Sequence, residues 1–131
     1  VKKIKWKFKQ DYYDEEFLDM FDREVEENVY DFVLSVNYFP MLAIACNRKH
    51  YKYVAWCCDC PFNITNPEET LPLETNYCFV FDYMQYLGFK NQGIDTVYHL
   101  PLGANYARAA KFSFDPKISA KYIAKMLSNV T

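Results

Sequence analysis

The chain has 131 residues, of which 51% are hydrophobic and 19% aromatic. These values exclude a disordered segment and indicate one domain, residues 1–131, that is large enough to bury a core. The formal net charge of -2 disfavours a nucleic acid as the main partner, because phosphate backbones are bound by basic surfaces.

Hydropathy and cysteine content bear on the compartment. No apolar run approaches the roughly 20 residues that span a bilayer, and the first residues lack the order of a signal peptide. The five cysteines are an odd number, which favours reduced thiols. We therefore expect a cytoplasmic protein without a membrane span.

The first 28 residues predict a strand followed by a helix. Ile4, Trp6 and Phe8 alternate with lysines, which is typical of a strand near a sheet edge. Residues 14–28 predict an amphipathic helix, because acidic residues fill its first turn and Asn28 suits its end.

Short and almost wholly apolar runs come next, and each leads into a polar side chain, a loop or the start of a helix. Such runs are typical of strands that are buried on both faces of a parallel sheet. We predict four of these strands, at residues 31–36, 53–57, 77–81 and 96–100.

The segments between these strands predict helices and one long loop. Pro40 suits the first position of a helix over residues 41–46, and a second helix covers residues 83–91. Residues 61–75 predict a long loop with room for one helical turn. Asp115 starts a last helix, whose buried stripe consists of Ile118, Tyr122, Ile123 and Met126.

Strands that alternate with helices predict an α/β fold. We expect a Rossmann-like three-layer sandwich, with a mostly parallel sheet of about five strands and helices on both faces. In such sheets, ligands bind outside the carboxyl ends of the strands. The polar residues at those ends are therefore the candidates for a site.

Asp59 and Asn37 are two such candidates. Asp59 lies before Pro61, where a buried strand ends, and its carboxylate suits a general base or a contact to a hydroxyl-bearing ligand. Asn37 places an amide beside Tyr38, a combination that suits recognition of a sugar or a base. The alternative for both is an ordinary role in a turn, where Asp and Asn bind backbone amides.

Three further residues at these ends have structural alternatives. Asp82 precedes a helix, so N-capping is a strong alternative to a binding role. Gly103 would let a ligand approach the backbone, or would simply serve a turn. His99 lies in a strand and suits a near-core position. The chain has no glycine-rich phosphate-binding motif, so no phosphate cradle is expected in it.

The cysteines do not form a recognisable metal or redox motif. Cys57, Cys58 and Cys60 lie together, but the other cysteines and the histidines are scattered, whereas zinc sites need a second set of ligands at regular spacing. A redox pair would lie at a helix start, and Pro61 here comes after a strand. We therefore predict no metal site.

Four segments in order carry a resemblance to a known family: YDFVLSVNYFP, YVAWCCDCPFNI, NPEETLPLETNYCFVFDYMQ and VYHLPLGAN. With these segments, residues 4–112 resemble the N-terminal domain of bacterial glycosyltransferases of the spore-maturation-protein (CgeB-like) kind. The positions that match the pattern of this family are Asn37, Tyr38, Pro40, Trp56, Asp59, Pro61, Asp82, Pro101, Leu102 and Asn105.

The resemblance implies a two-domain enzyme of the GT-B type. In such enzymes the C-terminal half generally holds the nucleotide-sugar donor, and the N-terminal half faces the acceptor. We therefore expect no cofactor in this chain, a donor-binding half as its partner in the same protein, and no activity of the chain alone. Asp59 is the candidate catalytic residue. The expected substrate-facing positions are Asn37, Tyr38, Asp59, Pro61, Asp82, Gly103 and Asn105.

The sequence departs from the family pattern in ways that affect these expectations. Tyr83 stands where an Arg is common, and Gly103 where Ala is usual. The strand and helix that open the family pattern are missing, so the chain is expected to be truncated at both ends. If the strand at residues 31–36 keeps an unpaired edge, we expect a homodimer through that edge. The alternative function is a non-catalytic, Rossmann-like binding module.

Overall fold

The structure, a computed structural model, describes residues 1–103 and 107. The predicted helix from Asp115 lies outside the described residues. In chain order the elements are α1 (Glu15–Glu27), β1 (Val33–Val36), α2 (Pro40–Arg48), β2 (Tyr53–Cys57), a 3₁₀ helix (Pro67–Glu69), β3 (Asn76–Val80), α3 (Tyr83–Asn91) and β4 (Val97–His99).

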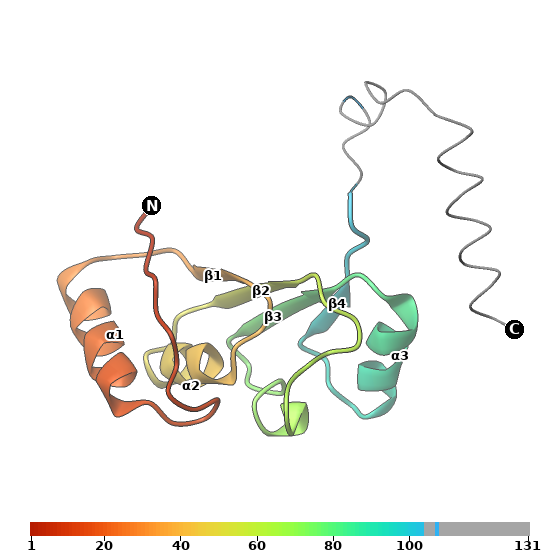
Figure 1. The fold of residues 1–131 in the computed structure, drawn as a ribbon, viewed down its shortest axis with the longest axis horizontal. Helices are drawn as coiled ribbons and strands as arrows, with labels where there is room; N and C mark the ends of the chain where they lie inside the picture. The colour runs from red at the N-terminus through yellow and green to blue at the C-terminus, as the bar shows by residue number, and fades with distance from the viewer. Residues whose placement is uncertain (104–106, 108–131) are drawn as a thin grey trace, which may run out of the picture.

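The four strands form one parallel sheet in the order β1-β2-β3-β4. The α/β Rossmann-like fold is therefore confirmed, with four strands in the described residues where about five were expected. Parallel crossovers are right-handed, so strands that are added in one direction carry their helices on the same face. Figure 1 shows α1, α2 and α3 below the sheet. The second helical layer that was expected is not among the described residues.

Burial alternates along the strands as this arrangement requires. On the helix-covered face, β2 buries Tyr53, Ala55 and Cys57 completely or nearly so. On the opposite face, Leu34 and Trp56 are exposed. Within the described residues the strands are thus buried on one face, whereas burial on both faces was expected. The sequence could not distinguish the two, because an unbroken apolar run does not reveal whether one or two layers cover a sheet.

The N-terminal segment does not form the predicted strand. Residues 4–8 pair with no strand among the described residues. Phe8 instead packs edge-on against Phe17 of α1, with 4.8 Å between ring centroids, and Trp6 packs against the same ring. The prediction was wrong because apolar alternation fits any segment that lies with one side on an apolar surface, and here that surface is a helix.

Capping residues set the bounds of α1 as predicted. The Asp14 carboxylate accepts a hydrogen bond from the Phe17 N–H (3.1 Å), and Asn28 ends the helix. Asp14 also accepts from Trp6 Nε1 and from the Lys9 N–H, both at 3.1 Å. Burial alone would raise the pKa of Asp14, but these hydrogen bonds outweigh burial and hold the pKa below its ordinary value.

β1 lies at one edge of the sheet and keeps an unpaired side within the described residues. The Val33 N–H donates to the Lys52 carbonyl and the Asn37 N–H to the Trp56 carbonyl, both at 2.8 Å. Because peptide groups alternate in direction along a strand, those of Leu34 point away from β2. This is the geometry that the predicted homodimer requires, and dimerisation itself stays a prediction.

Candidate functional site

Asn37 and Asp59 meet at the carboxyl edge of β1 and β2. The Asn37 Nδ2 donates to Asp59 Oδ2 at 2.7 Å, and the Cys58 N–H donates to Asn37 Oδ1 at 2.9 Å. The backbone of Asn37 is left-handed, with φ of 64°, a conformation that Asn tolerates better than most residues. One amide thus bridges the ends of two strands and holds an exposed carboxylate.

A buried hydroxyl group fixes the turn that carries Asn37. The Tyr53 side chain is fully buried, and its hydroxyl accepts from the Phe39 N–H at 3.0 Å. The same hydroxyl lies 2.7 Å from Ser35 Oγ, which donates to the Asn37 carbonyl at 2.6 Å. Burial raises the pKa of Tyr53, so this chain of hydrogen bonds remains intact at neutral pH.

A small cavity lies beside this pair, with a volume of about 170 Å³. Its lining combines polar and aromatic side chains: Asn37, Tyr38, Phe39, Cys57, Asp59, Phe62, Asn63 and Ile64. Pockets that enclose a whole small ligand usually measure about 300–1,000 Å³, so this hollow suits part of a ligand, as one wall of a larger cleft would.

Tyr38 supports the cavity from within the core. Its side chain is 3% exposed, and its ring packs against those of Tyr53 (5.6 Å between centroids) and Phe62 (5.8 Å). The Tyr38 hydroxyl accepts from Asn76 Nδ2 at 3.2 Å, and burial raises its pKa. Tyr38 was expected to face a substrate; in the structure it lines the cavity next to Asn37, and as a buried ring it contributes mainly through packing.

The remaining predicted site residues either are absent from the lining of this cavity or lie outside the described part. Pro61 follows a cis peptide bond after Cys60 and is exposed. Gly103 is exposed, and apart from its chain neighbours no atom of the described residues lies within 4 Å of the place that a β-carbon would occupy, so packing against that part of the chain does not require a glycine there. Asn105 lies outside the described residues.

Asp82 serves as the N-cap of α3. Its Oδ1 accepts from the Gln85 N–H at 2.7 Å. The helix comes directly after β3, so the side chain turns toward its free amide groups. Asp82 therefore has the N-capping role that the sequence offered as the alternative to ligand binding.

His99 was expected near the core and is instead exposed at the end of β4. Its Nε2 lies 3.1 Å from the Phe81 carbonyl, and its ring packs against Tyr83 and Tyr86. A carbonyl oxygen can only accept, so this contact is a hydrogen bond in the tautomer whose proton is on Nε2. The sequence signal for this aromatic cluster was the spacing of Tyr83 and Tyr86 on one helix.

The cysteines form no metal centre in the described residues, where no group of three suitable side chains could hold an ion. Cys57 and Cys78 are buried with their sulfurs 3.6 Å apart, on neighbouring strands. Contact with the Cys57 thiol and burial raise the pKa of Cys78, which keeps this thiol protonated and unreactive. Cys57 also lines the small cavity beside Asn37 and Asp59, where it adds an apolar contact.

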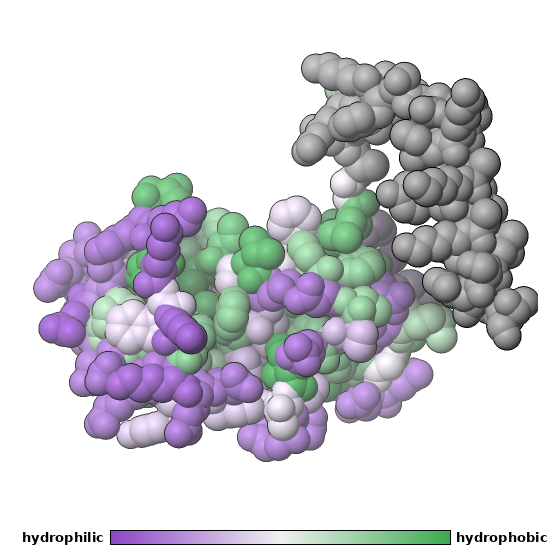
Figure 2. Space-filling model, viewed as in Figure 1, coloured by the Kyte–Doolittle hydropathy of each residue, from purple (hydrophilic) through white to green (hydrophobic). Residues whose placement is uncertain are grey.

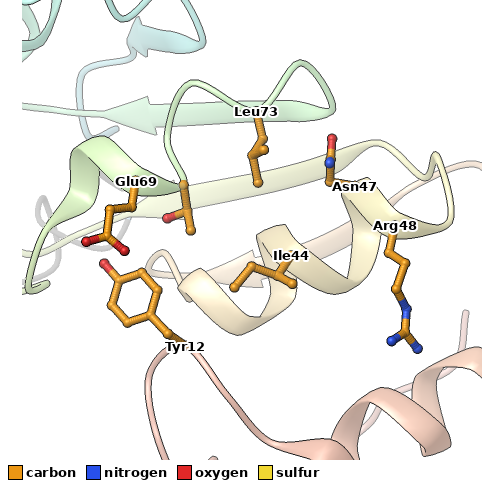
Figure 3. A pocket seen from close by; sticks show the side chains of 7 residues that line it. Tyr12, Ile44, Asn47, Arg48, Glu69 and Leu73 are labelled. Atoms are coloured by element: carbon orange, nitrogen blue, oxygen red, sulfur yellow. The ribbon is translucent and has the colours of Figure 1, made fainter.

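A larger cavity of about 480 Å³ lies on the helical side of the molecule (Figure 3). It is lined by Tyr12, Ile44, Asn47, Arg48, Glu69, Thr70 and Leu73. Its two charged side chains already have partners: Arg48 pairs with Asp22, and Glu69 accepts from Asn66 Nδ2 at 3.1 Å. Figure 3 shows Arg48 extending away from Tyr12 and Glu69. The strand edge is thus the better candidate site.

Comparisons of the chain with profiles of known families, with curated proteins and with solved structures find no match. In the part of the chain that the structure describes, no helix has the length and hydrophobicity to cross a membrane.

Proposed function

We propose that this chain is the acceptor-side domain of a GT-B glycosyltransferase, which transfers a sugar from a nucleotide-sugar to an acceptor hydroxyl group. The observation that supports this most directly is the Asn37–Asp59 pair, at 2.7 Å, on the rim of a partly aromatic hollow. Its position at the carboxyl edge of a parallel sheet is where ligands of such folds bind. The resemblance of the four sequence segments supplies the reaction class.

Asp59 has the geometry of a carboxylate that orients and deprotonates an acceptor. Its Oδ2 is held by Asn37, and within the described residues no hydrogen bond occupies Oδ1. An acceptor hydroxyl that donates to Oδ1 would pass its proton to Asp59 as its oxygen attacks the anomeric carbon. The bond from that carbon to the nucleoside diphosphate breaks, and the diphosphate leaves with the electron pair.

The hollow beside Asp59 suits a sugar or another polyol on chemical grounds. Phe62 offers an apolar ring, and Asn63 offers an amide, next to the carboxylate. Rings that pack on the apolar face of a sugar and polar groups that bind its hydroxyls are a suitable combination for this ligand class. The donor would bind in the second half of the enzyme, so the chain itself needs no cofactor.

The test is the Asp59→Asn variant, in a protein that joins this chain to its donor-binding half. Release of nucleoside diphosphate is measured with a panel of nucleotide-sugars and acceptor polyols. Loss of a general base lowers turnover by about 100- to 10,000-fold, with little change in the thermal unfolding of the protein. The matched control is Asp31→Asn, an exposed aspartate that precedes β1, at the opposite edge of the sheet.

Two results would contradict this proposal in different ways. Unchanged turnover of the Asp59→Asn variant would remove Asp59 from the mechanism while the enzyme assignment stands. If the unaltered protein releases no nucleoside diphosphate but binds polyols, the alternative of a non-catalytic, Rossmann-like binding module gains support.

A further inference from the structure

A cluster of partly exposed aromatic side chains lies at the end of the sheet that β4 and α3 form. Figure 2 shows the strongly hydrophilic residues gathered at the α1 end, at the left, whereas apolar residues are prominent over the strands. At the other end, Tyr83 opens α3 and is 54% exposed, and His99 is exposed at the end of β4. Tyr86, one turn further along α3, is half-buried. We call Tyr83, Tyr86 and His99 the aromatic platform.

The three rings of the aromatic platform hold one another in place. The Tyr83 ring meets the His99 ring edge-on, with 5.2 Å between centroids, and lies 5.9 Å from the Tyr86 ring. The rings of Tyr86 and His99 are 6.0 Å apart. In the tautomer whose proton is on Nε2, His99 also donates to the Phe81 carbonyl. Rings that are ordered before a ligand arrives lose little conformational entropy on binding, so this cluster favours packing against a ligand ring.

The aromatic platform lies at the same edge of the sheet as the Asn37–Asp59 pair. Cys57, Val80 and His99 are paired across β2, β3 and β4, so they form one row at the carboxyl ends of these strands. Cys57 lines the small cavity beside Asp59. Two strand spacings of about 4.8 Å separate Cys57 from His99, which amounts to about 10 Å.

Helix α3 gives a second, independent connection between this cavity and the aromatic platform. Phe62, one wall of the cavity, packs edge-on against Phe89 of α3 with 5.4 Å between ring centroids. Tyr83 lies six residues before Phe89 on this helix, which corresponds to about 9 Å along the helix axis. Both routes place the platform roughly 10 Å from the cavity, a span that suits a ligand with two linked rings.

We propose that the aromatic platform is a subsite for the second ring of the acceptor, whose first ring, a sugar or another polyol, lies beside Asp59. This inference rests on the proposed function and narrows its substrate to acceptors with two linked rings. The second ring would pack on Tyr83 with a flat face, which either an aromatic ring or the C–H face of a sugar supplies. The aromatic platform would thus determine which acceptor binds and take no part in the proton transfer.

The test measures binding to the 131-residue chain, so its readout does not depend on sugar transfer. Phenyl and methyl β-glycosides of glucose, galactose and N-acetylglucosamine are titrated, and cellobiose is the arm that supplies a second sugar ring. The readout is the NMR shift of the C–H signals of the His99 ring. Two-ring probes should shift these signals and bind about 3- to 10-fold more tightly than the methyl glycoside of the same sugar.

Variants of Tyr83 connect this preference to the aromatic platform. Tyr83→Ala should reduce the preference to about twofold or less, whereas Tyr83→Phe keeps a ring and should retain it. The matched control is Tyr13→Ala, which removes a tyrosine of similar exposure, 58%, just before α1 at the other end of the sheet. This control should bind all probes as the unaltered chain does.

The outcomes separate this proposal from the proposed function. No preference for two-ring probes, or a preference that survives in Tyr83→Ala, overturns the subsite. A preference for phenyl glycosides identifies an aromatic second ring and one for cellobiose a second sugar, and both support it. A Tyr83-dependent preference in a protein that releases no nucleoside diphosphate keeps the binding site and contradicts the transferase. Transfer without such a preference does the reverse.

Discussion

Asp59 and Asp82 occupy the same position on neighbouring strands, yet the structure uses them differently. Each lies two residues beyond the end of its strand, β2 or β3. A helix begins directly after Asp82, and its free amide groups take up the carboxylate. A loop begins after Asp59, and the side chain of Asn37 takes the place of those amides. The element after the strand, rather than the aspartate itself, decides whether the carboxylate stabilises a helix or faces the solvent.

The largest effect is expected from removing the partner that distinguishes Asp59. Asn37→Ala deletes the hydrogen bonds to Asp59 and from Cys58 and leaves a β-carbon at a positive φ. Sugar transfer should fall by roughly 100-fold, the scale of a misplaced catalytic group. In urea denaturation, the free energy of unfolding should fall by about 1–3 kcal/mol.

Asn37→Gly separates the two causes in that prediction. Glycine removes the same hydrogen bonds but adopts a positive φ without strain. Its transfer activity should match that of Asn37→Ala, while its stability is higher. Equal stability of the two variants would mean that backbone conformation does not matter at this position.

A smaller effect, on stability alone, is expected at Asp82. Asp82→Ala removes an N-cap and should lower the free energy of unfolding by about 1 kcal/mol, whereas Asp82→Asn keeps an acceptor and should cost less. Transfer should stay close to that of the unaltered protein, as measured by release of nucleoside diphosphate. A large loss of transfer in the well-folded Asp82→Asn variant would show that the contrast with Asp59 is wrong.

The smallest effect concerns pH and a third aspartate, Asp14, which caps α1 in a buried setting. Its folded pKa lies below the ordinary value, so its stabilising contribution is complete above a pH of about 4 and is lost as the pH falls through the folded pKa. Chemical denaturation between about pH 6 and pH 3 should show a weaker acid destabilisation for Asp14→Asn than for the unaltered chain. Parallel pH profiles of the two would contradict this contribution.

Local signals predicted the elements well, because capping residues act within one helical turn. Asp14 and Pro40 begin α1 and α2 as expected, and α3 has the predicted bounds. The strand at residues 4–8 was wrong, since alternation alone does not say which element covers the apolar side. The exposure of Leu34 and Trp56, on the sheet face opposite the helices, was not foreseen for a related reason. An apolar run indicates that a strand is apolar, but it does not indicate what lies on each side of the strand.

The candidate site was only half predictable from the sequence. The sequence places Asn37 and Asp59 at strand ends, but their contact depends on β1 and β2 being neighbours with Val36 beside Trp56. That pairing is a property of the whole sheet. The inward position of Tyr38 depends on the left-handed turn at Asn37, which redirects the chain and which no local apolar pattern reveals.

The hydroxyl group of Tyr53 ties the site to the stability of the core. A phenylalanine at this position would fill the same space, but the Phe39 N–H and Ser35 Oγ would lose a shared partner beneath Asn37. A protein engineer who optimised this core for packing alone would accept that exchange and would loosen the site unknowingly. The single oxygen of Tyr53 thus makes the interior of the sheet a determinant of how accurately its rim can hold a ligand.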